Sequence, residues 1–119
     1  MVKHIMTKVG EHITLDIIGT TKEYNPSVFE KVIHDIAEAA KVTILNISKY
    51  KFEPQGFTIL ALLAESHISF HTFPEKGIIS FDFFTCGKIS PSVAIDIIKK
   101  EFKHNRIVKK EFNRDTKSL

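Results

Sequence analysis

The sequence predicts an α+β fold, a two-layer sandwich in which two helices cover one face of a mainly antiparallel sheet. Two segments carry apolar residues at helical spacing, and about six others alternate every second residue or are rich in β-branched side chains. Helices and strands in this order are typical of α+β proteins. The 119 residues are enough for a buried core and are expected to form one domain, 1–119.

The first half of the chain begins with a lead-in and an alternating segment and continues as a helix. Residues 1–10 are expected to be a mobile or edge lead-in, and 12–18 place isoleucine and leucine opposite polar side chains, as in a half-buried strand. Asn25 suits a helix N-cap and Pro26 the first helical position, so the apolar residues that follow every three or four positions predict an amphipathic helix over 26–40. Two more strands are expected from their β-branched or apolar composition: 42–51 and 57–64.

The second half of the chain returns to alternation. In 66–73 the apolar residues share one face, whereas His67, Ser69 and His71 share the other. The residues at 74–77, Pro-Glu-Lys-Gly, are typical of a hairpin-type turn. The remaining expected elements are a strand over 78–86, a helix that Ser90 caps and Pro91 begins, and a last strand over 106–112.

One face of the predicted sheet has no helix to cover it. The apolar positions of each strand should face the two helices, so the alternate positions form a second, open face. That face is too polar for a core and too rich in reactive groups for an idle surface, so we expect a site, an oligomer interface or both. It would carry His12, Thr14, Asp16, His67, Ser69, His71, Ser80, Asp82 and Cys86.

The charge and composition favour a protein without nucleic-acid or membrane partners. The formal net charge is +3, and the basic excess near the C-terminal end has acidic residues among it, as on a solvated surface. The sequence has no signal peptide and no long apolar run, so we expect a cytoplasmic protein. Cys86 is the single cysteine and cannot form an internal disulfide, which leaves a buried hydrophobe, a metal ligand or a reactive thiol.

The Glu65-Ser66 step has chemistry of its own if it lies at a tight turn. The serine hydroxyl can attack the preceding carbonyl, which converts the peptide bond into an ester. β-Elimination then cuts the chain and leaves dehydroalanine, which hydrolyses to a pyruvoyl group and ammonia. His71 is a candidate base for the α-proton. The ketone would form a Schiff base with a substrate amine and act as an electron sink, and the thiol of Cys86 could protonate the carbanion left after decarboxylation.

Simpler interpretations compete with this chemistry. A Glu-Ser pair is common, and a single cysteine at a strand end is often a structural hydrophobe. A metal site built from His67, His71 and Cys86 matches no familiar zinc spacing, so no metal is expected. The chain has no Gly-x-Ser-x-Gly elbow, which argues against a serine hydrolase.

Several short motifs, spread from Gly10-Glu11-His12 to about Phe112, together form a specific pattern. The stretches are Asn46-Ile47-Ser48, Lys51-Phe52-Glu53-Pro54-Gln55-Gly56, Ala64-Glu65-Ser66-His67-Ile68-Ser69, His71-Thr72-Phe73-Pro74-Glu75 and Phe84-Thr85-Cys86-Gly87. In these motifs, nearly the whole chain resembles the small prokaryotic S-adenosylmethionine decarboxylases.

The resemblance implies a self-processing enzyme that decarboxylates S-adenosylmethionine for spermidine and polyamine synthesis. Ser66 would become the pyruvoyl cofactor, and cleavage after Glu65 would give a beta chain, 1–65, and an alpha chain, 66–119. Three further roles follow: His71 in processing, Cys86 as proton donor, and Phe52 with Glu75 in substrate binding. Relatives in this family act as pairs of cleaved protomers, so a homodimer with an αββα arrangement is expected.

Two departures from the family pattern keep alternatives open. The family usually has serine and glycine where this chain has Thr58-Ile59, and tryptophan where it has Phe73. Thr58 keeps a hydroxyl that could assist processing, but its β-branch is stiffer and Ile59 adds bulk. A related pyruvoyl-dependent arginine or ornithine decarboxylase is therefore one alternative. A small α+β dimerisation module that never cleaves is another.

Overall fold

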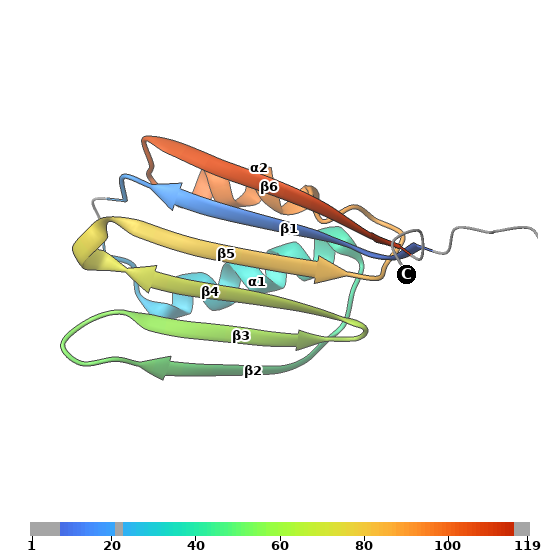
Figure 1. Ribbon diagram of the computed structural model, residues 1–119. Coiled ribbons are helices and arrows are strands. Elements are labelled where there is room, and N and C mark those ends of the chain that lie inside the picture. The colour runs from blue at the N-terminus through green and yellow to red at the C-terminus, as the bar shows by residue number, and fades with distance from the viewer. Residues whose placement is uncertain (1–7, 21–22, 116–119) are drawn as a thin grey trace, which may run out of the picture.

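The computed structural model describes residues 8–20 and 23–115, which form one six-stranded sheet with two helices packed behind it (Figure 1). All strand pairs are antiparallel, in the order β2-β3-β4-β5-β1-β6. This architecture confirms the predicted α+β sandwich. The elements are β1 (Lys8–Ile18), α1 (Pro26–Ala40), β2 (Ile44–Lys51), β3 (Phe57–Leu63), β4 (Ser66–Phe73), β5 (Ile78–Thr85), α2 (Val93–Glu101) and β6 (Arg106–Asp115), with a 3-10 turn at Pro74–Lys76.

Helix α1 begins and ends where its sequence predicts. Asn25 has extended backbone angles, and its side chain accepts a hydrogen bond from the Ser27 N–H at 3.1 Å. This contact satisfies one of the amide groups that a helix start leaves without a partner. The apolar stripe of the helix is buried against the sheet, with Phe29 and Ile33 fully covered. Lys41 ends the helix in the left-handed conformation with φ 55°.

Helix α2 begins later than predicted. Ser90 uses its hydroxyl to accept a hydrogen bond from the Ser92 N–H at 3.2 Å, which stabilises a turn and not the helix itself. The helix starts at Val93, so the expected start at Pro91 was wrong. Its Ala94 and Ile98 are nonetheless buried, as the apolar spacing predicted.

Strand β1 is longer and more central than predicted. It begins at Lys8 and lies between β5 and β6, but residues 8–10 pair with β6 alone, as an edge lead-in would. Residues 1–7 of that expectation lie outside the described residues. Gly10 permits the close packing there, because a Cβ on it would come within 2.6 Å of the Phe84 ring. Pairing with β6 extends the strand N-terminal to its alternating segment.

The core lies between the sheet and the helices. Its centre is a group of aromatic rings, in which Phe29 of α1 packs against Phe57, Phe70 and Phe102 at centroid distances of 4.9, 5.1 and 4.9 Å. Full burial of such a side chain contributes about 1.5–3 kcal/mol to folding.

No helix within 8–20 and 23–115 is long and apolar enough to cross a membrane.

The other sheet face is open to solvent, and it faces the viewer in Figure 1. The structure confirms that polar and titratable side chains gather on it: the pairings place His67, Phe84 and His12 in one row across β4, β5 and β1. The prediction missed the apolar part of this face. Large apolar side chains that remain 38–67% exposed there are Tyr50, Leu60, Leu62, Phe73 and Phe112.

Candidate active site

The Glu65-Ser66 step lies at a tight turn, as the proposed chemistry requires. Leu63 at the end of β3 pairs with Ser66 at the start of β4, so Ala64 and Glu65 alone form the hairpin loop. Glu65 adopts a φ of 62°, in the left-handed region that residues other than glycine rarely adopt. The Ala64 N–H donates to the Thr43 carbonyl at 2.9 Å and holds the turn against the segment before β2. The bond expected to break therefore follows a strained residue.

The Ser66 hydroxyl is buried and held in one position. Ser66 is 7% exposed and donates to the Thr85 hydroxyl oxygen at 3.1 Å, on the face of the sheet that the helices cover. Thr85, 1% exposed, also accepts from the Gly87 N–H at 3.0 Å. A Cβ on Gly87 would lie 3.1 Å from the same Thr85 oxygen, so a larger residue would crowd this contact.

Sequence reasoning did not assign a role to Thr85. The residue belongs to the Phe84-Thr85-Cys86-Gly87 stretch, in which the sequence points to Cys86 as the reactive group. Its contact with Ser66 follows from the β4–β5 register, which pairs the two residues directly. Strand parity alone would have placed both on the apolar face, but parity does not say which residues are opposite each other.

Cys86 follows directly after β5 and is exposed. Because Thr85 pairs with Ser66, Cys86 lies at the same end of the sheet as the cleavage site. The strand ends before Cys86, so its expected place in the alternation of β5 was wrong. An exposed thiol does not support the alternative that Cys86 is a buried structural hydrophobe.

A second group of predicted residues lies at the other end of the sheet. His71 Nδ1 and the Thr58 hydroxyl oxygen are 2.9 Å apart on the open face. The same two residues line a pocket of about 320 Å³ together with Phe52, Phe73 and Glu75. The structure thus brings the predicted processing histidine, the possible assisting hydroxyl and both predicted substrate-binding residues to one place.

The departures at Thr58-Ile59 affect this pocket less than expected. Thr58 keeps a hydroxyl within hydrogen-bond distance of His71. Ile59 is fully buried on the helix-covered face, so its bulk lies in the core and not among the pocket-lining residues. Phe73 does line the pocket.

Within one chain the two groups are far apart. Ser66 and His71 lie near opposite ends of β4, about 17 Å apart at the ordinary rise of a strand. They also lie on opposite faces, because successive side chains of a strand alternate. A single chain therefore does not bring His71 to Ser66, and the role of His71 stays a prediction.

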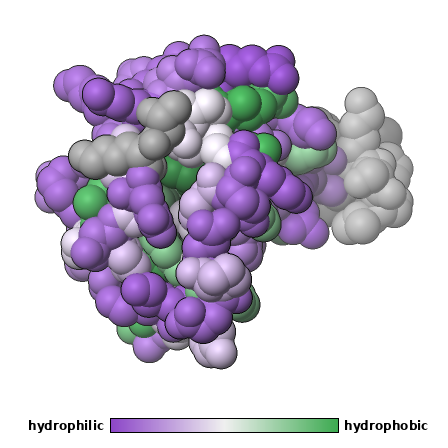
Figure 2. Space-filling model, turned by 90° about the vertical axis from the view of Figure 1, so that its left-hand side faces the viewer, coloured by the Kyte–Doolittle hydropathy of each residue, from purple (hydrophilic) through white to green (hydrophobic). Residues whose placement is uncertain are grey.

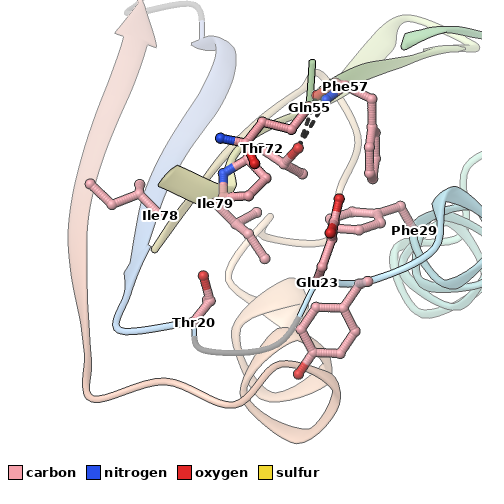
Figure 3. Close-up of a pocket in the computed structure, with 10 residues that line it drawn as sticks. Thr20, Glu23, Phe29, Gln55, Phe57, Thr72, Ile78 and Ile79 are labelled. Carbon is pink, nitrogen blue, oxygen red and sulfur yellow. Dashed lines mark hydrogen bonds between the residues drawn. The ribbon is translucent and has the colours of Figure 1, made fainter. Parts of the chain in front are cut away.

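A second pocket, separate from the one that His71 lines, lies at the end of the sheet where β4 stops. Figure 2 looks at this end, where hydrophilic side chains dominate the surface and apolar atoms show between them. Thr20, Glu23 and Phe29 line a pocket of about 270 Å³ on the helix side of the sheet (Figure 3). The Phe57 N–H donates to the Thr72 hydroxyl at 2.9 Å at its edge. None of the predicted reacting residues lines this pocket. The candidate site is therefore identified by its reactive side chains and not by the presence of a pocket.

Comparisons with known proteins agree with the motifs of the site. The family model for S-adenosylmethionine decarboxylase matches residues 11–115. The chain is 39% identical over 111 residues to an S-adenosylmethionine decarboxylase proenzyme of Prochlorococcus marinus, covering 91% of this chain and 89% of that protein. It is 39% identical over 106 residues to the proenzyme of the same name from Methanococcus maripaludis, covering 86% of each.

A solved structure agrees with the fold. The crystal structure of the adenosylmethionine decarboxylase from Aquifex aeolicus VF5 superposes with a TM-score of 0.79 at 32% sequence identity. The match covers 91% of this chain and 92% of that one. The likeness therefore spans most of the chain.

Proposed function

This chain belongs to the S-adenosylmethionine decarboxylase family, and from that premise we propose that it cleaves itself between Glu65 and Ser66 to make a pyruvoyl-dependent enzyme. Its reaction is the decarboxylation of S-adenosylmethionine, which provides the aminopropyl donor for polyamine synthesis. The products of cleavage are a beta chain, 1–65, and an alpha chain, 66–119. The observation that carries the proposal is the two-residue turn in which Glu65, held in the left-handed conformation, directly precedes the buried Ser66.

The cleavage uses atoms of this turn. The Ser66 oxygen bonds to the Glu65 carbonyl carbon as the C–N bond breaks, and the ester formed frees the Ser66 nitrogen. A base removes the Ser66 α-proton, and the main-chain carboxylate of Glu65 leaves from the β-carbon, so that residue 66 becomes dehydroalanine. Water then replaces the nitrogen, which departs as ammonia. The contact with Thr85 holds the attacking hydroxyl in place, and release of the left-handed Glu65 favours the opening of the turn.

The base that removes the α-proton comes from a second copy of the chain. His71 is the predicted base, but it lies about 17 Å along β4 from Ser66 and on the other face. The Ser66 side chain points toward the helices, and tetrahedral geometry tilts its α-hydrogen away from the side chain. A base that approaches from the open face therefore meets the hydrogen. A partner stacked on that face can provide it.

The composition of the open face supports such a homodimer. Half-exposed apolar side chains such as Leu60 and Leu62 lie beside the polar groups, and covering them removes apolar surface from water. A two-fold axis between the sheets and perpendicular to the strands stacks the His71 end of one chain over the Ser66 end of the other. An axis parallel to the strands would stack like ends, so the proposed function requires the perpendicular one.

The pocket at the His71 end suits the substrate. Phe52 is 50% exposed and offers an aromatic face for the adenine ring. Glu75 is exposed in the same pocket, and its carboxylate can accept hydrogen bonds from the substrate. In the stacked dimer this pocket adjoins the partner's Ser66 end. The matching family and the names of the relatives favour S-adenosylmethionine over arginine or ornithine as the substrate.

The reacting end of the site contains Ser66 and Cys86. A pyruvoyl group at Ser66 supplies an electron sink for the electron pair left when carbon dioxide departs. The exposed thiol of Cys86 is one residue beyond Thr85, which pairs with Ser66, so it lies at the reacting end of the sheet and is the candidate proton donor.

An intact-mass measurement of the purified protein tests the proposal. The expected result is two fragments that correspond to 1–65 and 66–119, and carbon dioxide release from S-adenosylmethionine. Ser66→Ala removes the nucleophile and should leave the chain whole. A wild-type chain that stays intact and inactive would support the non-cleaving dimerisation module instead, and cleavage of Ser66→Ala at the same bond would refute the mechanism.

A further inference from the structure

The open face holds a second cluster of reactive side chains that the proposed reaction does not use. Ligand atoms of His12, His67 and Asp82 all lie within 4.8 Å of one another. These residues come from β1, β4 and β5. The set differs from the one considered from the sequence, since it includes neither His71 nor Cys86.

The sheet register and one aromatic ring hold this cluster together. His67 and His12 both pair with Phe84, from opposite sides of β5. Two strands on either side of a third are about 9.6 Å apart, yet the two imidazole centroids are 6.1 Å apart, so both rings lean over β5. Phe84 supports both, with centroid distances of 5.8 Å to His67 and 5.9 Å to His12.

Asp82 completes the cluster with a negative charge. Its carboxylate oxygen contacts His12 Nε2 directly, and both side chains are partly shielded, with 37% and 24% exposure. Among the described residues, Asp82 forms its ion pair with His12 and with no lysine or arginine. The nearby guanidinium of Arg114 instead stacks over the Phe84 ring at 5.2 Å. The partner of the carboxylate is thus His12, which is itself a member of the cluster.

We propose that His12, His67 and Asp82 bind a divalent transition-metal ion on the open face, with Zn²⁺ as the type ion. Two imidazoles and one carboxylate are a donor set that zinc accepts, and three protein ligands leave a fourth position for water. Bonds of 2.0–2.2 Å in a tetrahedral site put ligand atoms about 3.4 Å apart, so no pair of the three has to close by more than about 1.4 Å. His12 and Asp82, now in direct contact, must separate to admit the ion.

The site would tie three neighbouring strands together beneath the proposed dimer interface. β4 carries the cleavage site at one end, and β5 and β1 lie next to it in the sheet. An ion bound here stabilises the folded chain, because the unfolded chain does not hold the three ligands together. The inference does not depend on the proposed reaction, since it concerns residues outside the reacting group.

The test uses full-length, untagged protein that has been treated with a chelator and then dialysed. Titration with Zn²⁺ in competition with a chromophoric chelator should show about one ion per chain, in line with a single three-ligand site. His12→Ala, His67→Ala and Asp82→Asn should each weaken binding by at least about tenfold. His34→Ala, which removes an exposed histidine of α1, and Cys86→Ser should leave the affinity unchanged.

Two further measurements keep the result clear. Co²⁺ should give visible d–d bands without an intense thiolate band in the near ultraviolet, as expected of nitrogen and oxygen ligands. Zn²⁺ should raise the melting temperature of wild type and of His34→Ala but not of His67→Ala, a variant at an exposed position that should fold without difficulty. Absence of binding tighter than about 10 μM, a thiolate band, or unchanged affinity in His67→Ala would each overturn the proposal.

Discussion

Mixing two inactive variants would test whether the active site is shared between chains. In His71→Ala the nucleophile Ser66 is intact but the base is lost, and in Ser66→Ala the reverse holds. Each variant alone is expected to stay uncleaved. The distance along β4, about 17 Å, rules out repair within one chain, so any cleavage on mixing must use His71 of one chain and Ser66 of the other.

The expected amount of cleavage follows from random pairing. When the two variants are co-expressed equally, about half of all dimers contain one chain of each kind. In such a dimer the Ser66 of the His71→Ala chain meets the intact His71 of the other chain. About half of the His71→Ala chains should therefore be cut, and none of the Ser66→Ala chains.

Intact-mass spectrometry of the co-expressed protein distinguishes the two chains by their masses. The products should be the fragment 1–65 and an alpha chain 66–119 that carries alanine at position 71. Separate expression of each variant is the control. If the mixture stays uncleaved although mixed dimers are present, or if His71→Ala cleaves on its own, the shared site is refuted.

Three other substitutions probe separate steps. Thr85→Val keeps the shape but removes the acceptor for Ser66, so cleavage in a pulse-labelled time course should slow by about fivefold, the equivalent of about 1 kcal/mol; an unchanged rate would limit Thr85 to packing. Cys86→Ala should still cleave while single-turnover release of carbon dioxide falls by about 10²–10⁴-fold, and near-normal turnover would remove the thiol from the reaction. Leu60→Lys places a charge on the open face, so the chain should be a monomer by light scattering and should stay uncleaved. The control Ala39→Lys, at an exposed position of α1, should cleave normally. A cleaved dimer of Leu60→Lys would contradict the stacked arrangement.

Local spacing in the sequence was enough to predict most of the fold. Helix α1 follows from the N-cap Asn25 and an apolar stripe of period 3.6, and β4 and β5 follow from strict alternation, because these patterns reflect which face of each element is buried. The start of α2 was missed because Ser90 caps a turn before the helix. The extent of β1 was missed because pairing with β6, and not its own composition, determines where it begins.

The motifs of the sequence also nominated the reacting residues, but the tertiary structure decided how they are grouped. Which residues are opposite each other in neighbouring strands depends on long-range register, and alternation alone does not encode it. Register brings Thr85 to Ser66 and Thr58 to His71, and it keeps these two pairs at opposite ends of the sheet. The same register leans His12 and His67 over β5 toward Asp82, a cluster drawn from three strands that no spacing along the chain could reveal.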